Sequence, residues 1–311
     1  MASKVAVLGA TGQQGGAVAA ALVQKGVAVV AITRNPDSDK AKLLAANANC
    51  EVRKADLNDV ESLVAAFEGC DKAFVIANFW EGMDVGVEYS HYKNVTEALK
   101  KVGSMKHIVY TTLEESSLGR PGLDDFKVLA EHETGPMKVP HFDGKARAEK
   151  LFEGLPVTFM VTSCYFENFT SFFSFTPQED GTFTFTLPLR QKAIPWTILG
   201  DLGLLVASVF EKPELVGQRV GQASFLATGD QLAEIFSKAT GKTIKYNEVS
   251  WETFAGFGFP AADELAQMFE FWLRIYDDFV QARDLDAQRQ ITKAEFTEPI
   301  QYAKTLPLRF G

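Results

Sequence analysis

The residues most able to do chemistry near the N-terminus are three glycines that follow an apolar run. They stand in the segment Val5-Ala-Val-Leu-Gly9-Ala-Thr-Gly12-Gln-Gln-Gly15. A helix that begins inside such a turn presents free backbone N–H groups and its positive dipole end to an anion. Gly9 allows the tight turn, Gly12 lets the backbone approach a pyrophosphate, and Gly15 lets helix and strand pack closely. Because the flanking strand and helix are both predicted, the motif indicates a dinucleotide site.

The end of the second apolar run indicates which dinucleotide is bound. It reads Ile32-Thr33-Arg34-Asn35-Pro36 and has no acidic residue at its tip. Folds that bind NAD usually place Asp or Glu there, whereas an Arg accommodates the 2′-phosphate of NADP. A permanently charged, planar guanidinium suits phosphate, so Arg34 predicts NADP(H). A solvated Arg34 is the alternative, and we interpret the nearby Asp37 and Asp39 as caps of the next helix.

Six short apolar runs must position these residues. They cover Lys4–Leu8, Ala28–Ile32, Glu51–Arg53, Ala73–Ala77, His107–Thr111 and Val157–Val161. Continuous apolar runs are typical of parallel strands buried on both faces, and helical patterns fill the intervals between them. Right-handed helical crossovers place helices on both faces of such a sheet. The sequence therefore predicts an α/β fold with a doubly wound parallel sheet of the Rossmann type.

The residue composition and the periodicity of the chain change after Thr162. Phenylalanines crowd into residues 159–185, and residues 182–186 alternate with the period of a half-buried strand. Helical patterns return at residues 201–210, 230–239 and 263–279. We expect a Rossmann domain at 1–162, with part of 190–212, and a smaller α+β lobe at 163–311 for a substrate or partner. The phenylalanines fit an apolar substrate pocket, a partner surface or a hydrophobic core.

Composition excludes several functional classes. The chain has 311 residues and a formal net charge of −9, which argues against direct binding of nucleic acid. Its three cysteines form no CxxC pair and its four histidines no HExxH pattern, so no metal site is expected. We find no signal peptide and no apolar run long enough to span a membrane, so we expect a cytoplasmic protein, with the nucleus also open to it. The sequence leaves the oligomeric state open, a homodimer included.

Several motifs together resemble the NmrA-like family of atypical short-chain dehydrogenases/reductases. The glycine segment followed by Thr33-Arg34-Asn-Pro carries the resemblance, although the glycine motif alone is shared with many dehydrogenases. Much more specific are His141-Phe-Asp-Gly-Lys145 and Cys164-Tyr-Phe-Glu-Asn168. Together with Asn78-Phe-Trp-Glu81 they look most like a human NADPH-sensing member. The resemblance extends to about Phe269 and is weakest beyond it.

The resemblance implies a set of cofactor contacts. It assigns the pyrophosphate to Gly9, Ala10, Thr11, Gly12, Gln13 and Gln14. It assigns the 2′-phosphate to Arg34 and Asn35, while Ser38 stands where relatives often carry a second basic residue. It assigns the adenine and the nicotinamide ribose to Asp56, Leu57, Ala77, Asn78, Phe79 and Lys145. It assigns the nicotinamide end to Tyr165, Phe166, Glu167 and Asn168. Turn or cap chemistry is the alternative for Asp56, Asn78 and Tyr165.

The catalytic pair is less complete than the cofactor site. In typical short-chain dehydrogenases a Tyr four residues before a Lys supplies the proton, and here the pair is His141 and Lys145. An imidazole can move a proton at neutral pH. Thr111 or Thr112 occupies the region of the usual Ser partner. The alternatives are a helix-start role for His141 and ribose binding alone for Lys145, and we expect the nearby Cys164 to be buried and inert.

Two hypotheses for the function follow. In the first, the protein binds NADP(H) with little turnover and reports the cellular redox ratio to a protein partner. The missing Tyr and the long aperiodic segment 113–140, which we expect to be weakly held, favour it. In the second, the protein is an NADPH-dependent reductase of a quinone, aldehyde or phenolic small molecule that binds in an apolar pocket.

Overall fold

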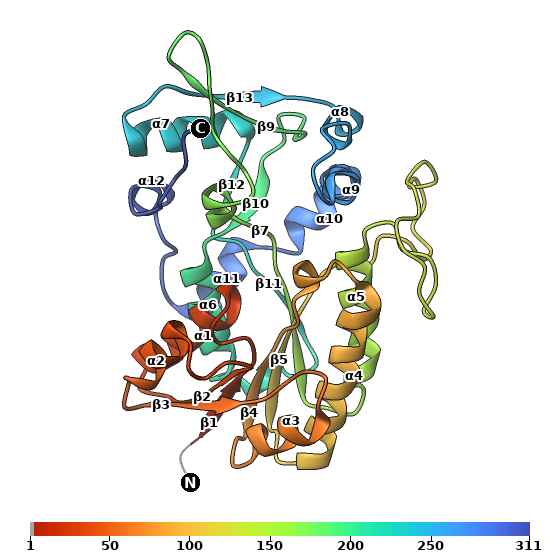
Figure 1. Cartoon of the computed structure of the whole chain (residues 1–311), viewed down its shortest axis with the longest axis vertical. Coiled ribbons are helices and arrows are strands. Elements are labelled where there is room, and N and C mark those ends of the chain that lie inside the picture. The colour runs from red at the N-terminus through yellow and green to blue at the C-terminus, as the bar shows by residue number, and fades with distance from the viewer. Residues whose placement is uncertain (1–2) are drawn as a thin grey trace.

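The computed structural model describes residues 3–311, which are built around a seven-stranded parallel sheet (Figure 1). Its strands, in order across the sheet, are β11 (Arg219–Gly221), β6 (Val157–Val161), β5 (His107–Thr112), β4 (Lys72–Val75), β1 (Lys4–Val7), β2 (Ala28–Thr33) and β3 (Cys50–Lys54). The chain leaves β1 for β2 on one side and returns to β4 on the other. Ligands of such sheets bind at this switch point, beyond the carboxyl ends of the strands. The predicted doubly wound sheet is confirmed.

Helices cover both faces of the sheet (Figure 1). One face packs against α3 (Val60–Phe67), α4 (Val85–Val102) and α5 (Pro140–Ala148), which a short 3-10 turn extends to residue 152. The other face packs against α1 (Gln13–Gln24) and α6 (Leu199–Val209), and α2 (Asp39–Ala45) lies next to β3. Side chains of both faces are therefore buried, which explains why the strands read as continuous apolar runs.

Close approaches of the backbone attach residues beyond 190 to this sheet. A Cβ on Gly203 of α6 would lie 2.3 Å from the carbonyl oxygen of Ala17 in α1. A Cβ on Gly221 of β11 would lie 1.7 Å from the carbonyl oxygen of Ala282. The seventh strand β11 was not predicted, because a three-residue strand with one apolar side chain, Val220, gives no periodic signal.

The remaining chain forms a smaller lobe with two mixed sheets. Its strands are β7 (Cys164–Tyr165), β8 (Thr176–Pro177), β9 (Phe183–Leu187), β10 (Ile194–Thr197), β12 (Phe225–Ala227) and β13 (Ile244–Glu248). Its helices are α7 (Gly229–Thr240), α8 (Trp251–Ala255), α9 (Ala262–Arg274), α10 (Tyr276–Gln281) and α12 (Pro299–Ala303). Helix α11 (Leu285–Thr292) packs against α6 beside the parallel sheet. The helix expected over 263–279 is broken at Ile275, which ends α9. The predicted fold with a smaller α+β lobe is confirmed.

Most of the clustered phenylalanines form the core of this lobe. Phe166, Phe169, Phe175 and Phe185 are fully buried and pack around Phe236 of α7. Phenylalanine side chains bury more apolar surface than most others, so such a cluster dominates the stability of a small lobe. Of the three interpretations left open by the sequence, a hydrophobic core fits these four residues.

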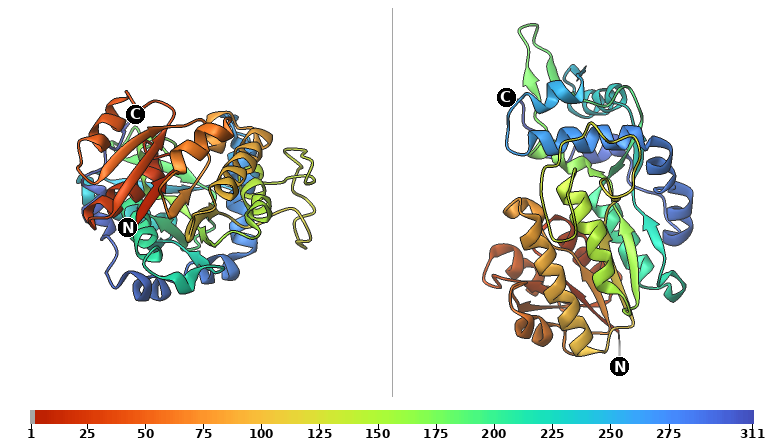
Figure 2. Two further views of the ribbon diagram at one scale, coloured as in Figure 1. Left: turned by 90° about the horizontal axis from the view of Figure 1, so that it is seen from below. Right: turned by 90° about the vertical axis from the view of Figure 1, so that its right-hand side faces the viewer.

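The segment 113–139 between β5 and α5 has no helix or strand beyond a single bridge between Ala130 and Met137. It loops out beside α5 in Figure 1 and passes over α9 in the right-hand view of Figure 2. The expectation that little holds it is wrong, because the buried Asp143 accepts hydrogen bonds from Ser116 N at 2.6 Å and Lys138 N at 3.0 Å. Within residues 3–311, no helix combines the length and apolar character needed to cross a membrane.

Candidate dinucleotide-binding site

The turn between β1 and α1 has the geometry of an anion cradle. Gly9 has a φ of +61°, a backbone conformation that side chains rarely adopt. A Cβ on Gly15 would lie 2.3 Å from the carbonyl oxygen of Gly9, so only glycine lets α1 start this close to the strand. Gly12 precedes the helix without a capping side chain, and the first N–H groups of α1 have no partner within the helix. These groups fit the pyrophosphate of a dinucleotide.

Two further contacts border this turn. Thr11 Oγ1 lies 3.4 Å from Thr33 Oγ1 at the end of β2. Gln14 Nε2 donates a hydrogen bond to the hydroxyl of Tyr165 in β7, which ties the turn to the smaller lobe. Burial raises the pKa of Tyr165 to about 12, so this hydroxyl stays neutral at physiological pH. Gln14 Oε1 is buried without a hydrogen-bond partner in the described part of the chain.

Arg34 lies at the tip of β2 but is not a free cation. Its two terminal nitrogens donate to Glu81 Oε1 at 2.7 Å and Glu81 Oε2 at 3.0 Å. The side chains of Arg34 and Glu81 are 63% and 53% exposed, so the pair is in contact with water. The hydrogen bonds to Glu81 raise the pKa of Arg34. Sequence reasoning missed Glu81 in this role, because a carboxylate 47 residues away carries no signal of the pairing.

The neighbours of Arg34 stabilise the turn into α2. Asn35 Oδ1 accepts a hydrogen bond from Asp37 N at 3.1 Å. Ser38 Oγ accepts from Ala41 N at 3.3 Å and so caps α2. The cap is therefore Ser38 and not Asp37 or Asp39, while Asp39 lies in the first turn of α2, where an acid is favourable.

The loop after β3 presents Asp56 and Leu57 beside this end of the site. Asp56 Oδ1 accepts from Asn58 N at 2.9 Å, and this hydrogen bond lowers the pKa of Asp56. The Leu57 carbonyl accepts from Asn94 Nδ2 of α4 at 2.8 Å. These bonds fix the loop and leave the second carboxylate oxygen of Asp56 free of hydrogen bonds from residues 3–311.

The chain that leaves β4 forms a short 3-10 helix, η1 (Phe79–Glu81), which carries Glu81. Asn78 Oδ1 accepts from Trp80 N at 3.2 Å and starts this turn, and Phe79 is buried. Ala77 N donates to the hydroxyl of Tyr92 in α4 at 3.1 Å. The predicted residues Ala77, Asn78 and Phe79 thus fix the start of η1, the turn that carries Trp80 and Glu81.

Lys145 forms a buried ion pair that the sequence did not reveal. Its Nζ donates to Glu88 Oε1 of α4, and the two residues are only 8% and 1% exposed. Glu88 Oε2 has no hydrogen-bond partner among the described residues, and Tyr92 OH lies 3.4 Å from Oε1. Gly144 permits this approach, because a Cβ there would lie 2.6 Å from Val85 Cγ2. The pair fixes the position of the ammonium group.

His141 lies one turn before Lys145 on α5 and is held by a second carboxylate. Its Nδ1 lies 2.6 Å from Glu264 Oε1 of α9, and the same oxygen accepts from His141 N at 2.8 Å. The ring centroid of Trp80 lies 4.8 Å from that of the imidazole. A carboxylate at Nδ1 orients the ring and leaves Nε2 to exchange a proton with a bound molecule. Glu264 was not predicted, since 123 residues separate it from His141.

The side chains of the segment that begins at Tyr165 have different neighbours. Phe166 is buried in the lobe core, and Glu167 Oε1 accepts from Leu199 N at 2.9 Å and Tyr302 OH at 2.6 Å. Asn168 Nδ2 donates to Cys164 Sγ at 3.6 Å. Tyr165 alone among the four side chains of Tyr165–Asn168 contacts the glycine turn in the described structure.

Three more residues that the sequence raised, Cys164, Thr111 and Thr112, make no hydrogen bond to His141 or Lys145 in the described structure. Burial raises the pKa of Cys164 to about 12, so the thiol is protonated and unreactive at neutral pH, as expected. Thr112 Oγ1 donates to Glu149 Oε1 at 2.6 Å and is committed to that contact. Thr111 Oγ1 is buried without a hydrogen-bond partner in the part of the chain that is described.

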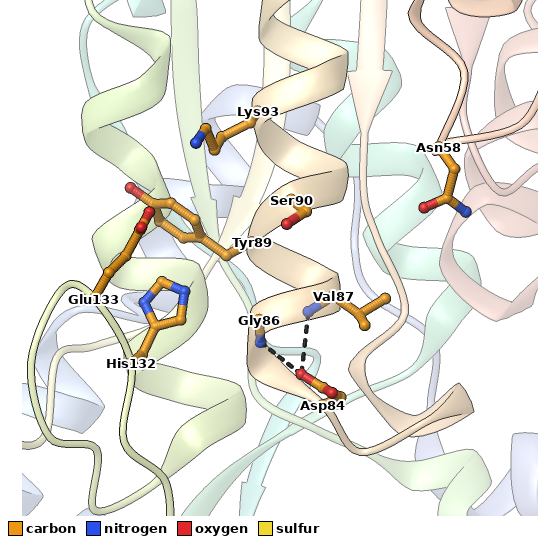
Figure 3. Close-up of a pocket in the computed structure, with 9 residues that line it drawn as sticks. All are labelled: Asn58, Asp84, Gly86, Val87, Tyr89, Ser90, Lys93, His132 and Glu133. Carbon is orange, nitrogen blue, oxygen red and sulfur yellow. Dashed lines mark hydrogen bonds between the residues drawn. The ribbon is translucent and has the colours of Figure 1, made fainter.

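A separate hollow of about 500 Å³ lies along the outer side of α4 (Figure 3). Its walls are formed by Asn58, Asp84, Gly86, Val87, Tyr89, Ser90, Lys93, His132 and Glu133. Asp84 Oδ1 accepts from Gly86 N and Val87 N and is occupied as the cap of α4. None of the predicted cofactor residues lines this hollow, so it is distinct from the dinucleotide site.

Comparison with known proteins supports the family and the fold. Residues 1–305 match the NmrA-like family. An NmrA-like family domain-containing oxidoreductase, FrzB of a Cladobotryum species, is 33% identical over 289 residues, which cover 86% of this chain and 83% of FrzB. It is a fungal protein, and the expected resemblance to a human NADPH-sensing member is not supported by it.

Two solved structures share the fold. The negative transcriptional regulator NmrA, solved in complex with NADP, superimposes with a TM-score of 0.78 at 21% identity and covers 98% of this chain and 95% of its own. An NADPH-dependent quinone oxidoreductase of Escherichia coli, solved with NADPH, superimposes with a TM-score of 0.70 at 24% identity, covering 96% and 98%. By its matched residues and its relative, the chain belongs to the NmrA-like family.

Proposed function

We propose that the protein binds NADP(H) at the switch point of the sheet and reduces a quinone or a similar conjugated carbonyl compound. The observation that carries the proposal is the His141–Glu264 pair beside the fixed ammonium of Lys145. The family assignment, the oxidoreductase name of the fungal relative and the shared fold of a quinone reductase support it. It is the second of the two hypotheses drawn from the sequence.

Each part of the chain has a role in this proposal. Residues 1–162, together with α6 and β11 of the same sheet, hold the dinucleotide, and the smaller lobe covers it. The glycine turn binds the pyrophosphate, Arg34 the 2′-phosphate and Lys145 the nicotinamide ribose. When bound, the cofactor supplies a hydride. We place the protein in the cytoplasm, where NADPH is available.

The protein must supply the proton that accompanies the hydride. With a proton on both nitrogens, His141 donates from Nε2 to the substrate oxygen while Glu264 stabilises the positive ring at Nδ1. Trp80 packs against the ring at an interplanar angle of 52°, and the burial of His141 limits the access of water. His141 would thus replace the Tyr of typical short-chain dehydrogenases.

Steady-state oxidation of NADPH with a panel of quinones and aldehydes tests this function. We expect turnover with quinones, and a loss of about a hundredfold or more in kcat for His141→Phe, which keeps the ring but removes the proton donor. His132→Phe is the matched control, since His132 lines the separate hollow beside α4 and not the dinucleotide site. Absence of turnover with every substrate, or equal turnover in both variants, would reject the reductase proposal.

A cofactor-reporting regulator remains the second candidate because of how the segment 113–139 is attached. Its anchors Asp143 and Arg147 lie two residues on either side of Lys145 on α5, and Arg147 pairs with Glu115 at 2.9 Å. A ligand that binds Lys145 in one conformation of α5 would shift this segment. Hydrogen exchange with and without NADPH measures the effect, and identical exchange over residues 113–145 would exclude this role.

A further inference from the structure

The fold brings the turn that carries Glu81 to the tip of β2, where the carboxylate contacts Arg34. Both terminal nitrogens of the guanidinium donate to the carboxylate, at 2.7 Å and 3.0 Å. Glu81 is the last residue of η1, a turn that Asn78 caps and that the buried Phe79 anchors. The tip of β2 has no acidic residue of its own. Its carboxylate neighbour is Glu81, which comes from the turn after β4.

A 2′-phosphate and this carboxylate compete for one cation. A guanidinium binds a carboxylate or a phosphate through the same pair of parallel N–H groups. Two anions that approach the same edge also repel each other, and Asp56 adds a further negative charge near Arg34. NADH has a neutral hydroxyl at this position and meets no such competition. The same residues thus favour the 2′-phosphate through Arg34 and oppose it through Glu81.

We propose that Glu81 is a specificity-determining residue that weakens binding of the 2′-phosphate and so narrows the preference for NADPH over NADH. This inference rests on the proposed binding of a dinucleotide at the glycine turn. Cofactor preference is usually decided at the end of the second strand. Glu81 lies instead on the turn that follows β4.

The test is the affinity for NADPH and for NADH, measured by calorimetry at one fixed, low salt concentration. For Glu81→Gln we expect NADPH to bind about threefold to tenfold more tightly and NADH to bind as before. Glu97→Gln is the matched control, because it removes an exposed carboxylate paired at 3.1 Å with Lys101 near the far end of α4. Glu81→Asp, which keeps the charge, should stay close to the wild-type ratio of affinities.

A second background separates competition from other effects. In Arg34→Ala, Glu81→Gln should change NADPH affinity by less than in the wild type, since the contested cation is gone. An unchanged ratio in Glu81→Gln, an equal shift for both cofactors, or a ratio that rises only because NADH binds more weakly would overturn the role of Glu81. If the wild-type protein bound neither dinucleotide, the proposed function would fail together with this inference, whereas the first three outcomes leave that function intact.

Discussion

The two ends of the candidate site use the same chemistry in opposite environments. At the proposed adenosine end, Arg34 and Glu81 meet in contact with water, with more than half of each side chain exposed. At the proposed nicotinamide end, Lys145 and Glu88 are almost completely buried. An exposed pair contributes about 0.2–1 kcal/mol, whereas removing one partner of a buried pair costs about 3–5 kcal/mol. The first pair is easily exchanged for a ligand and the second is a fixed part of the fold.

This difference separates recognition from chemistry. A cation that must bind a phosphate from solution needs a partner whose ion pair costs little free energy to break, and Glu81 is such a partner. A group that must hold a ribose or orient a proton needs one position, and Glu88 and Glu264 fix Lys145 and His141 from α4 and α9. Positioned groups in a region that excludes water are also the more effective ones in catalysis.

The largest effect is expected at the buried pair. Glu88→Ala leaves the Lys145 ammonium buried without a counter-charge and should lower the free energy of unfolding by about 3–5 kcal/mol. Urea denaturation measures it, and Glu97→Ala on the same helix, where the side chain is 56% exposed, should change the value by less than about 0.5 kcal/mol. A loss below about 1 kcal/mol for Glu88→Ala would mean that the contrast between the two ends is absent in solution.

At the exposed end, the expected effect is on binding and not on folding. Arg34→Ala removes the charge-assisted contacts to the 2′-phosphate and should weaken NADPH binding by about 1–3 kcal/mol while NADH binding is unchanged. Calorimetry at one salt concentration measures both affinities. Arg289→Ala serves as the control, since Arg289 pairs with Asp286 on the surface of α11. Equal losses for the two cofactors would show that Arg34 does not contact the 2′-phosphate.

The same contrast explains what the sequence could predict. The glycine turn and Arg34 were found because their function depends on fixed spacing from a strand end, which is visible in the sequence. Glu81, Glu88 and Glu264 were not, since each is brought to its partner by tertiary packing across 47, 57 and 123 residues. A glutamate on a helix reads as part of a solvated face, and only the packing of α4 and α9 shows that Glu88 and Glu264 are buried.

A buried histidine that forms no ion pair among the described residues provides a third case. His107 is the first residue of β5, and its Nε2 lies 2.8 Å from Thr158 Oγ1 of β6. Burial lowers the pKa of His107 from 6.5 to about 4. Between these values the unfolded chain binds a proton that the folded chain does not. Stability should therefore fall as the pH falls, by about 1 kcal/mol from this residue between pH 7 and pH 5.5. Urea denaturation at both pH values, with His107→Gln as the variant that lacks this slope, measures the contribution.

The smallest effect is expected where the exposed pair is broken without a ligand. Glu81→Gln keeps the length of the side chain and a hydrogen-bond acceptor for Arg34, and water solvates the guanidinium that remains. The free energy of unfolding should therefore change by less than about 1 kcal/mol, and by less still at high salt, where surface charges are screened. Urea denaturation of this variant at low and high salt, beside the wild type, gives the value. A loss above about 2 kcal/mol that persists at high salt would make Glu81 a structural residue like Glu88. It could then not act as the exchangeable partner of Arg34, and the contrast between the two ends would disappear.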